Sequence, residues 1–314
     1  MVVVTAPQKI CIYEDAAMQE TYNLLETLYS LVVVQKKSVS LDLSKVEWMT
    51  AAASVLLFAT VNSCQLRTGN QSVIRCIFPK AESNPLGHRC IVKTGLSIAL
   101  SAGTEDKLKQ LTKSGRYYQS STSAVQMREP TLQLLTRRTE LKQDQLDLLV
   151  TGVSEAMLNV SHHAYKDPSS KPGEYLIDKS MVSFVKTVGE RWWQCAWRND
   201  KDKSCTFIIC DLGLGIAKTY NHIKQSIFHQ NVPSSAIVEA LKLGNSRFVG
   251  LGRGNGSDDM KRPIDLGARE ELLVYSNGTK YLYESGLDVP RVSNFNMGIH
   301  GTLVQWKVYP EETD

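Results

Sequence analysis

The stretch Cys205-Thr-Phe-Ile-Ile-Cys-Asp-Leu-Gly-Leu-Gly-Ile216 joins an apolar strand to a glycine-rich turn. Its first six residues are apolar or β-branched, which is typical of a buried strand. Asp211 follows directly, and Gly213 and Gly215 let the backbone turn tightly and approach a ligand. A carboxylate at a strand end can accept a hydrogen bond from an amino group. We therefore expect a ligand to bind at Asp211.

Upstream of this strand, residues 132–165 carry apolar residues at the spacing of one long helix or two abutting helices. Glu155, Asn159 and His163 recur every fourth residue, so on an α-helix they share one face. A carboxylate can deprotonate a water molecule, and an amide oxygen can coordinate Mg²⁺. The alternative interpretation is a solvated helix face that carries an acid, an amide and a histidine.

Two further motifs lie downstream of the strand. Alternating glycines precede Ser257–Ile264, which begins like a capped helix, and glycine-rich backbone at a helix N-terminus can bind an anion. The alternating glycines are Gly250, Gly252, Gly254 and Gly256. Arg247, just before them, is either a charge clamp or a surface arginine on a loop. The last motif is Gly301-Thr302, within a late apolar run.

The four motifs, in this order, resemble those of the GHKL ATPases, the group with the Bergerat fold, over about residues 130–310. The resemblance implies a two-layer α+β sandwich that binds ATP and Mg²⁺. With Arg247 added, the expected ATP-binding residues are Asn159, His163, Tyr165, Asp211, Gly213, Gly215, Arg247, Gly250, Gly252, Gly254, Gly256 and Thr302.

By this resemblance, Glu155 looks like the catalytic acid that activates water, and Asn159 like the magnesium ligand. Asp211 looks like the residue that reads adenine, supported through water by Thr302. His163 and Tyr165 would line the phosphates and the base, and the glycines would form one edge of a lid at residues 217–249.

The first half of the chain alternates strand-like and helical patterns, which indicates a small α/β unit. We expect strands at Lys9–Tyr13, Val39–Leu43 and Ser72–Phe78, and helices near Met18–Val33 and Thr50–Phe58. Residues 80–125 contain two short helical patterns that the sequence does not place.

Residues Val39–Phe58 resemble the central segment of STAS domains, in which a serine that opens the helix is commonly phosphorylated. Ala51 takes that place here, with Thr50 and Ser54 the nearest hydroxyls. The resemblance therefore implies a docking or dimerisation module instead of a phosphorylation switch. Trp48 and Met49 are candidates for its docking face, and core packing is the alternative for both.

Composition sets the remaining expectations. The 314 residues suit two domains, which we place at 1–122 and 123–314, and 42% hydrophobic with 22% charged residues suits a soluble globular protein. No apolar run reaches the roughly 18 residues of a membrane span, and no signal peptide is evident, so we expect a cytoplasmic protein. The seven cysteines lack a C-x-x-C pair and are expected to be reduced thiols.

The leading hypothesis is an ATP-dependent regulatory switch that binds or releases a protein partner and hydrolyses ATP slowly. An anti-sigma-type protein serine/threonine kinase and a non-catalytic ATP sensor are the alternatives. A histidine kinase is disfavoured because no histidine lies between His88 and His162. Nucleic-acid binding is disfavoured because the net charge of +4 comes from basic residues interleaved with acids. A homodimer is left open.

Overall fold

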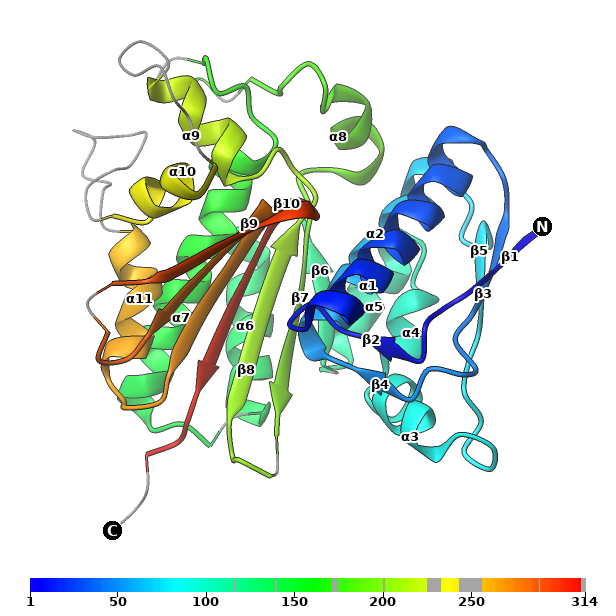
Figure 1. Ribbon diagram of the computed structural model, residues 1–314, viewed down its shortest axis with the longest axis horizontal. Helices are drawn as coiled ribbons and strands as arrows, with labels where there is room; N and C mark the ends of the chain where they lie inside the picture. Colours follow the sequence, from blue (N-terminus) through cyan, green and yellow to red (C-terminus); the bar gives the residue numbers. More distant parts are fainter. Residues whose placement is uncertain are drawn as a thin grey trace. The chain divides into compact units, whose positions relative to one another are not determined.

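The computed structural model in Figure 1 describes residues 1–314 except 116, 139, 171–173, 175, 200, 225–232, 243–255, 288 and 312–314. The chain is mixed α/β, with both parallel and antiparallel strand pairs, which confirms the fold class expected at this level. It divides into two compact units. The first is Met1–Ser121 with Trp193–Cys195, and the second is Thr122–Trp192 with Ala196–Asp314.

The first unit is built on a parallel sheet of three strands. The central strand is β3 (Val39–Asp42), and β1 (Val2–Thr5) and β5 (Ile74–Ile77) pair with it on either side. The sequence predicts β3 and β5 but not β1, whose side chains are alternately half-buried and exposed. A second, two-stranded parallel sheet joins β2 (Lys9–Ile10) to β4 (Trp48–Met49).

Two long helices accompany these strands. The first, α1 (Asp15–Tyr29), continues into the π-helical turn η1 (Ser30–Val34). The second, α2 (Ala51–Thr68), is buried along most of its length, as its alanine-rich sequence predicts. The hydroxyl of Thr50 caps α2 by accepting a hydrogen bond from the backbone of Ala53, and Gly69 ends the helix in a left-handed conformation.

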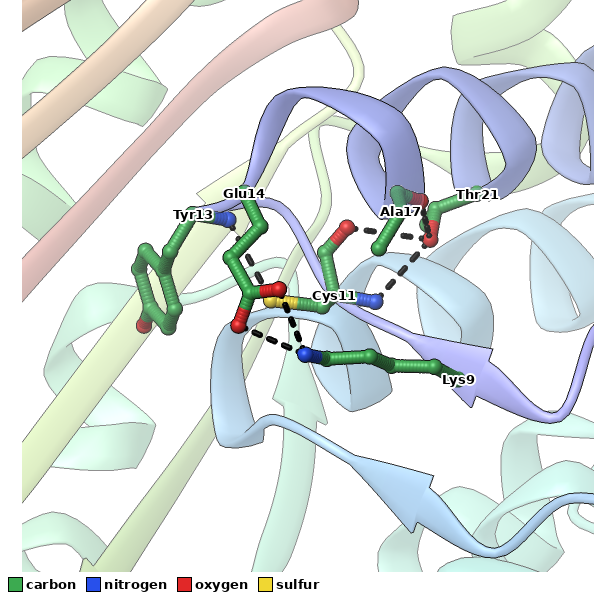
Figure 2. A network of polar contacts seen from close by, with 6 residues as sticks. All are labelled: Lys9, Cys11, Tyr13, Glu14, Ala17 and Thr21. Carbon is green, nitrogen blue, oxygen red and sulfur yellow. Dashed lines mark hydrogen bonds and ion pairs between the residues drawn. The ribbon is translucent and has the colours of Figure 1, made fainter.

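The strand expected at Lys9–Tyr13 ends at Ile10 because the next backbone groups bond to α1 (Figure 2). The Thr21 hydroxyl accepts the N–H of Cys11 at 3.0 Å and lies 3.1 Å from the carbonyl oxygen of the same residue. Lys9 pairs with Glu14 at 2.5 Å on the surface. The Thr21 hydroxyl thus bonds backbone groups of Cys11 that a strand partner would otherwise bond.

Residues 80–121, from the stretch 80–125 that the sequence left unassigned, belong to the first unit. They form α3 (Pro85–Gly87), the π-turn η2 (His88–Lys93), α4 (Leu96–Leu100), α5 (Glu105–Lys113) and β6 (Tyr118–Ser121). Gln119 on β6 accepts a hydrogen bond from the side chain of Gln194 at 2.9 Å, and the indole N–H of Trp193 donates to Asn62 at 2.8 Å. These side chains are buried.

The second unit places helices against an antiparallel sheet. Its strands are β7 (Trp192–Arg198), β8 (Cys205–Asp211), β9 (Glu271–Glu284) and β10 (Arg291–Val308), with β10 between β8 and β9. The helices are α6 (Ala124–Arg138), α7 (Gln143–Asn159), α8 (Val182–Val188), α9 (Ile216–Lys224), α10 (Pro233–Ala240) and α11 (Gly256–Asp265). The region 132–165, expected to be one long helix or two abutting ones, contains the later part of α6, then α7, and ends in a π-helical turn.

The helices α7 and α11 lie together on one face of this sheet (Figure 1). The indole N–H of Trp306 on β10 donates to the carbonyl oxygen of Met260 on α11 at 2.8 Å. At Gly152 on α7, a side chain would meet the backbone of Asp259 at 3.0 Å, so glycine permits this close packing. Among the described residues, no helix is long and apolar enough to cross a membrane.

Candidate functional site

The carboxyl group of Asp211 lies at the end of β8 and is 5% exposed. Its Oδ1 atom accepts the backbone N–H of Gly213 at 2.8 Å. Burial raises the pKa of Asp211 to about 7, although hydrogen bonds from the backbone of Gly213 and Thr302 act to lower it. The Asp211 carboxyl group therefore changes between its neutral and ionised forms near neutral pH, which is unusual for an aspartate.

The turn after Asp211 packs closely against two other segments. A Cβ atom on Gly213 would lie 2.1 Å from the carbonyl oxygen of Ala164, and one on Gly215 would lie 2.2 Å from Oδ1 of Asn277. Gly215 also has a φ of +81°, which disfavours other residues. In the structure these two glycines therefore meet protein atoms, whereas the sequence suggested that they make room for a ligand.

Thr302 lies beside this turn, on an irregular part of β10. The β9–β10 register shifts between Ile299 and Thr302, and Gly301 there adopts a φ of +80°. A Cβ atom on Gly301 would lie 2.2 Å from the backbone oxygen of Asp211, so glycine allows the two strands to approach. The bulge thus brings the Gly301-Thr302 motif against the Asp211 motif.

Ser276 is part of this cluster, and none of the four sequence motifs includes it. Its hydroxyl lies 3.2 Å from the hydroxyl of Thr302 and accepts the backbone N–H of Ile216 at 2.7 Å. The next residue, Asn277, has a positive φ of 52°, and its side-chain oxygen is buried without a hydrogen-bond partner among the described residues. The one signal in the sequence is a polar pair that follows the apolar run Leu272–Tyr275.

Tyr165 supports the turn from the core. Its hydroxyl donates to the carbonyl oxygen of Arg191 and accepts the N–H of Leu212 at 3.3 Å. Its ring stacks on Phe184 with a centroid distance of 5.6 Å and is fully buried. The structure therefore places Tyr165 behind the loop, where it fixes the backbone, and not on a surface that a base or phosphate would contact.

Two of the expected site residues, Glu155 and Asn159, lie in the last turns of α7. Glu155 is half-buried, and Asn159 is exposed with its amide nitrogen 3.7 Å from the sulfur of Met260 on α11. The chain then winds as the π-helical turn η3 (Val160–Ala164), which contains His163. A π-turn holds more residues than an α-turn, so His163 does not continue the α-helical stripe that the sequence predicts. Such turns are frequent at functional sites.

The structure describes only the last residue of the glycine motif. Arg247, Gly250, Gly252 and Gly254 lie outside the described residues, whereas Gly256 begins α11. Asp258 and Asp259 occupy the first turn of this helix, where their charge complements the positive end of the helix dipole. An anion at this N-terminus would meet two carboxylates, so the electrostatic basis for binding is weaker than the glycine pattern suggests.

Direct contacts join the described motifs within the second unit. The carbonyl oxygen of Ala164, at the end of η3, accepts the N–H of Leu214 in the Asp211 turn at 2.7 Å. Gly301 contacts Asp211, and Asn159 contacts α11 just after the glycine motif. Residues separated by as many as 101 positions in the sequence thus contact one another within this unit.

The start of α2 in the first unit carries the residues that resemble the phosphorylation segment of STAS domains. Ser54 is buried, and its hydroxyl donates to the carbonyl oxygen of Ala51 at 2.6 Å and accepts from the hydroxyl of Tyr118 at 2.9 Å. Trp48 is 59% exposed, whereas Met49 is buried. Of the two residues proposed for a docking face, only Trp48 is therefore available on the surface.

A scan of protein-family models finds no match to this chain, and a search of curated proteins finds no significant match. A functional assignment must therefore come from the residues around Asp211 and from their geometry.

Proposed function

We propose that this chain is an ATP-binding protein of the GHKL type, with an α+β sandwich of Bergerat type in its second unit and a STAS-like first unit. The nucleotide would bind at Asp211, and its binding would control the association of a protein partner. The observation that supports this proposal best is the buried Asp211 carboxyl, which lies beside the glycine turn and next to Thr302.

A buried carboxyl group with a raised pKa lacks the solvation that its charged form needs. Because Oδ1 already accepts from Gly213, a ligand amino group near the other oxygen would supply a further donor. The exocyclic amino group of adenine has this chemistry, and it would stabilise the ionised carboxylate. This complementarity supports a base as the ligand of Asp211.

Mg²⁺ would be held by the amide oxygen of Asn159 together with phosphate oxygens, since this ion keeps several waters and needs few protein ligands. The described residues contain no cluster of three or more histidine, cysteine or acidic side chains suited to a metal, and such a site would not require one. Bound Mg²⁺ supplies positive charge that offsets the charge of the phosphates. Glu155, one turn before Asn159, would accept a proton from the attacking water.

The same pocket would also serve a protein serine/threonine kinase. In this chain Ser54 is buried and engaged in two hydrogen bonds, so a kinase of this type would act on a separate protein. Transfer of the labelled γ-phosphate of ATP to a STAS-domain protein would favour this alternative. Release of free phosphate alone would favour the ATPase.

Isothermal titration of ATP with Mg²⁺ into the wild type, Asp211→Asn and Asn159→Ala tests the proposal. We expect Asp211→Asn to abolish binding, because the amide oxygen keeps the bond from Gly213 and the amide NH₂ then faces the donor on the base. Asn159→Ala should remove the Mg²⁺ dependence of the affinity. Wild-type affinity in Asp211→Asn would contradict the proposal.

Phosphate release from the same samples separates an ATPase from a sensor. Glu155→Ala is expected to lower the release rate by about 100-fold or more, since a positioned general base contributes about that factor. The matched control is Ser154→Ala. In the wild type, the Ser154 hydroxyl donates to the backbone oxygen of Val150 on the same helix. Release that is unchanged by Glu155→Ala, with ATP still bound, would leave ATP as a ligand only.

A further inference from the structure

Ser276 ties the first turn of α9 to the strands that carry the Asp211 cluster. It is 2% exposed, and its hydroxyl accepts the backbone N–H of Ile216, the first residue of α9, at 2.7 Å. The first N–H groups of a helix have no partner within the helix and need one from elsewhere. A side chain from β9, sixty residues later in the sequence, supplies this partner.

The other hydrogen-bond partners within reach of the Ser276 hydroxyl lie on β10. A hydroxyl group has one proton to donate and two lone pairs, and Ile216 occupies one lone pair. Thr302 Oγ1 lies 3.2 Å away and the carbonyl oxygen of Gly301 lies 3.3 Å away, so the proton can go to either. Gly301 in turn contacts the backbone of Asp211. A single side chain therefore connects the start of α9 with the support of the carboxyl group.

In the turn between Asp211 and α9, every second backbone N–H donates a hydrogen bond to another segment of the second unit. The N–H of Leu212 donates to the Tyr165 hydroxyl, that of Leu214 to the backbone oxygen of Ala164, and that of Ile216 to Ser276. The N–H of Gly213, between these anchors, is left to bond the Asp211 carboxyl. Loss of the Ser276 anchor would release the end of the turn that leads into α9 while the other two anchors remain.

We propose that Ser276 is a positioning residue of the ligand site, which couples binding of a base at Asp211 to the position of the first turn of α9. This inference rests on the proposed function, because the base is the ligand expected there. A base that fixes Asp211 and Gly213 would strengthen the bond between Ile216 and Ser276. By reciprocity, a disrupted Ser276 anchor weakens the binding of the base.

The test measures two quantities in the full chain: the affinity for ADP with Mg²⁺, by titration calorimetry, and the hydrogen exchange of the Ile216 amide. We expect Ser276→Ala to weaken ADP binding about tenfold and to speed Ile216 exchange by a similar factor, because a partly buried N–H loses its acceptor. Ser276→Thr keeps the hydroxyl and should restore both values to within about threefold of the wild type.

The control variant is Thr279→Ala, which removes another buried hydroxyl of β9, bonded to Asn294 at 3.1 Å. It should lower the melting temperature without changing ADP affinity or Ile216 exchange. If Ser276→Ala does not fold, Ser276→Cys, whose sulfur is a weak acceptor, takes its place.

Wild-type ADP affinity in Ser276→Ala, or an equal loss in Thr279→Ala, would overturn the role of Ser276 alone. Failure of the wild-type chain to bind ADP would instead contradict the proposed function, and with it the coupling.

Discussion

The start of α2 in the first unit and the Asp211 turn in the second both carry polar groups where a strand gives way to a helix. At α2, the Thr50 hydroxyl caps Ala53, and the Ser54 hydroxyl bonds with Ala51 and Tyr118. These groups serve the fold and have little capacity left for a ligand.

At the Asp211 turn the balance is different. The carboxyl group is buried with a pKa of about 7. The side-chain oxygen of Asn277, close to Gly215, is buried without a hydrogen-bond partner in the part of the chain that the structure describes. Burial of such groups costs free energy that packing must offset. Sites that bind or react commonly carry this kind of cost, so the difference supports the proposal of a ligand site in the second unit.

For the Asp211 turn, we expect Gly213→Ala to have the largest effect on stability. The new methyl group would lie 2.1 Å from the backbone oxygen of Ala164, so we expect the free energy of unfolding to fall by about 3 kcal/mol or more. Gly286→Ala is the control, since nothing lies within 4 Å of its Cβ position and only its φ of +75° is strained. It should cost about 1–2 kcal/mol in urea unfolding. Equal losses would show that the turn is not tightly packed.

The pH dependence of stability tests the buried carboxyl. The pKa of Asp211 is about 7 in the folded protein against 3.8 for an ordinary aspartate. Its contribution to stability is therefore fully present below about pH 4 and is lost as the pH rises through 7. Relative to Asp211→Asn, the unfolding free energy of the wild type should fall by roughly 4 kcal/mol at most across this range. Parallel curves for the two proteins would place an ordinary, solvated carboxylate at this position.

Trp48→Ala, in the first unit, should have the smallest effect on stability of the three. Trp48 is 59% exposed, with the ammonium group of Lys9 5.5 Å from its ring centroid. We expect a loss below about 1 kcal/mol in urea unfolding and no change in ATP affinity. Weaker binding of a protein partner by this variant would identify Trp48 as a docking residue. A large loss of stability would instead assign it to the core.

The sequence predicts several of the regular elements, because apolar periodicity identifies α1, α2, α7, β3, β5 and β8 directly. It does not predict β1, whose short edge pattern is weak, or the π-turn η3, which has no distinct residue signature. Within the site, Asp211 and Thr302 follow from motifs. Ser276 does not, because its contact with Ile216 depends on strand register across sixty residues.

The short stretch Trp193–Cys195, which belongs to the first unit, has a consequence for how the protein is made. Chains emerge from the ribosome at about 5–20 residues per second, and N-terminal domains generally fold first. Here the indole of Trp193 supplies the partner of the buried Asn62, so residues 1–121 alone would leave this amide oxygen unpaired. The first unit must therefore wait several seconds, while part of the second is synthesised, before its last core residues arrive.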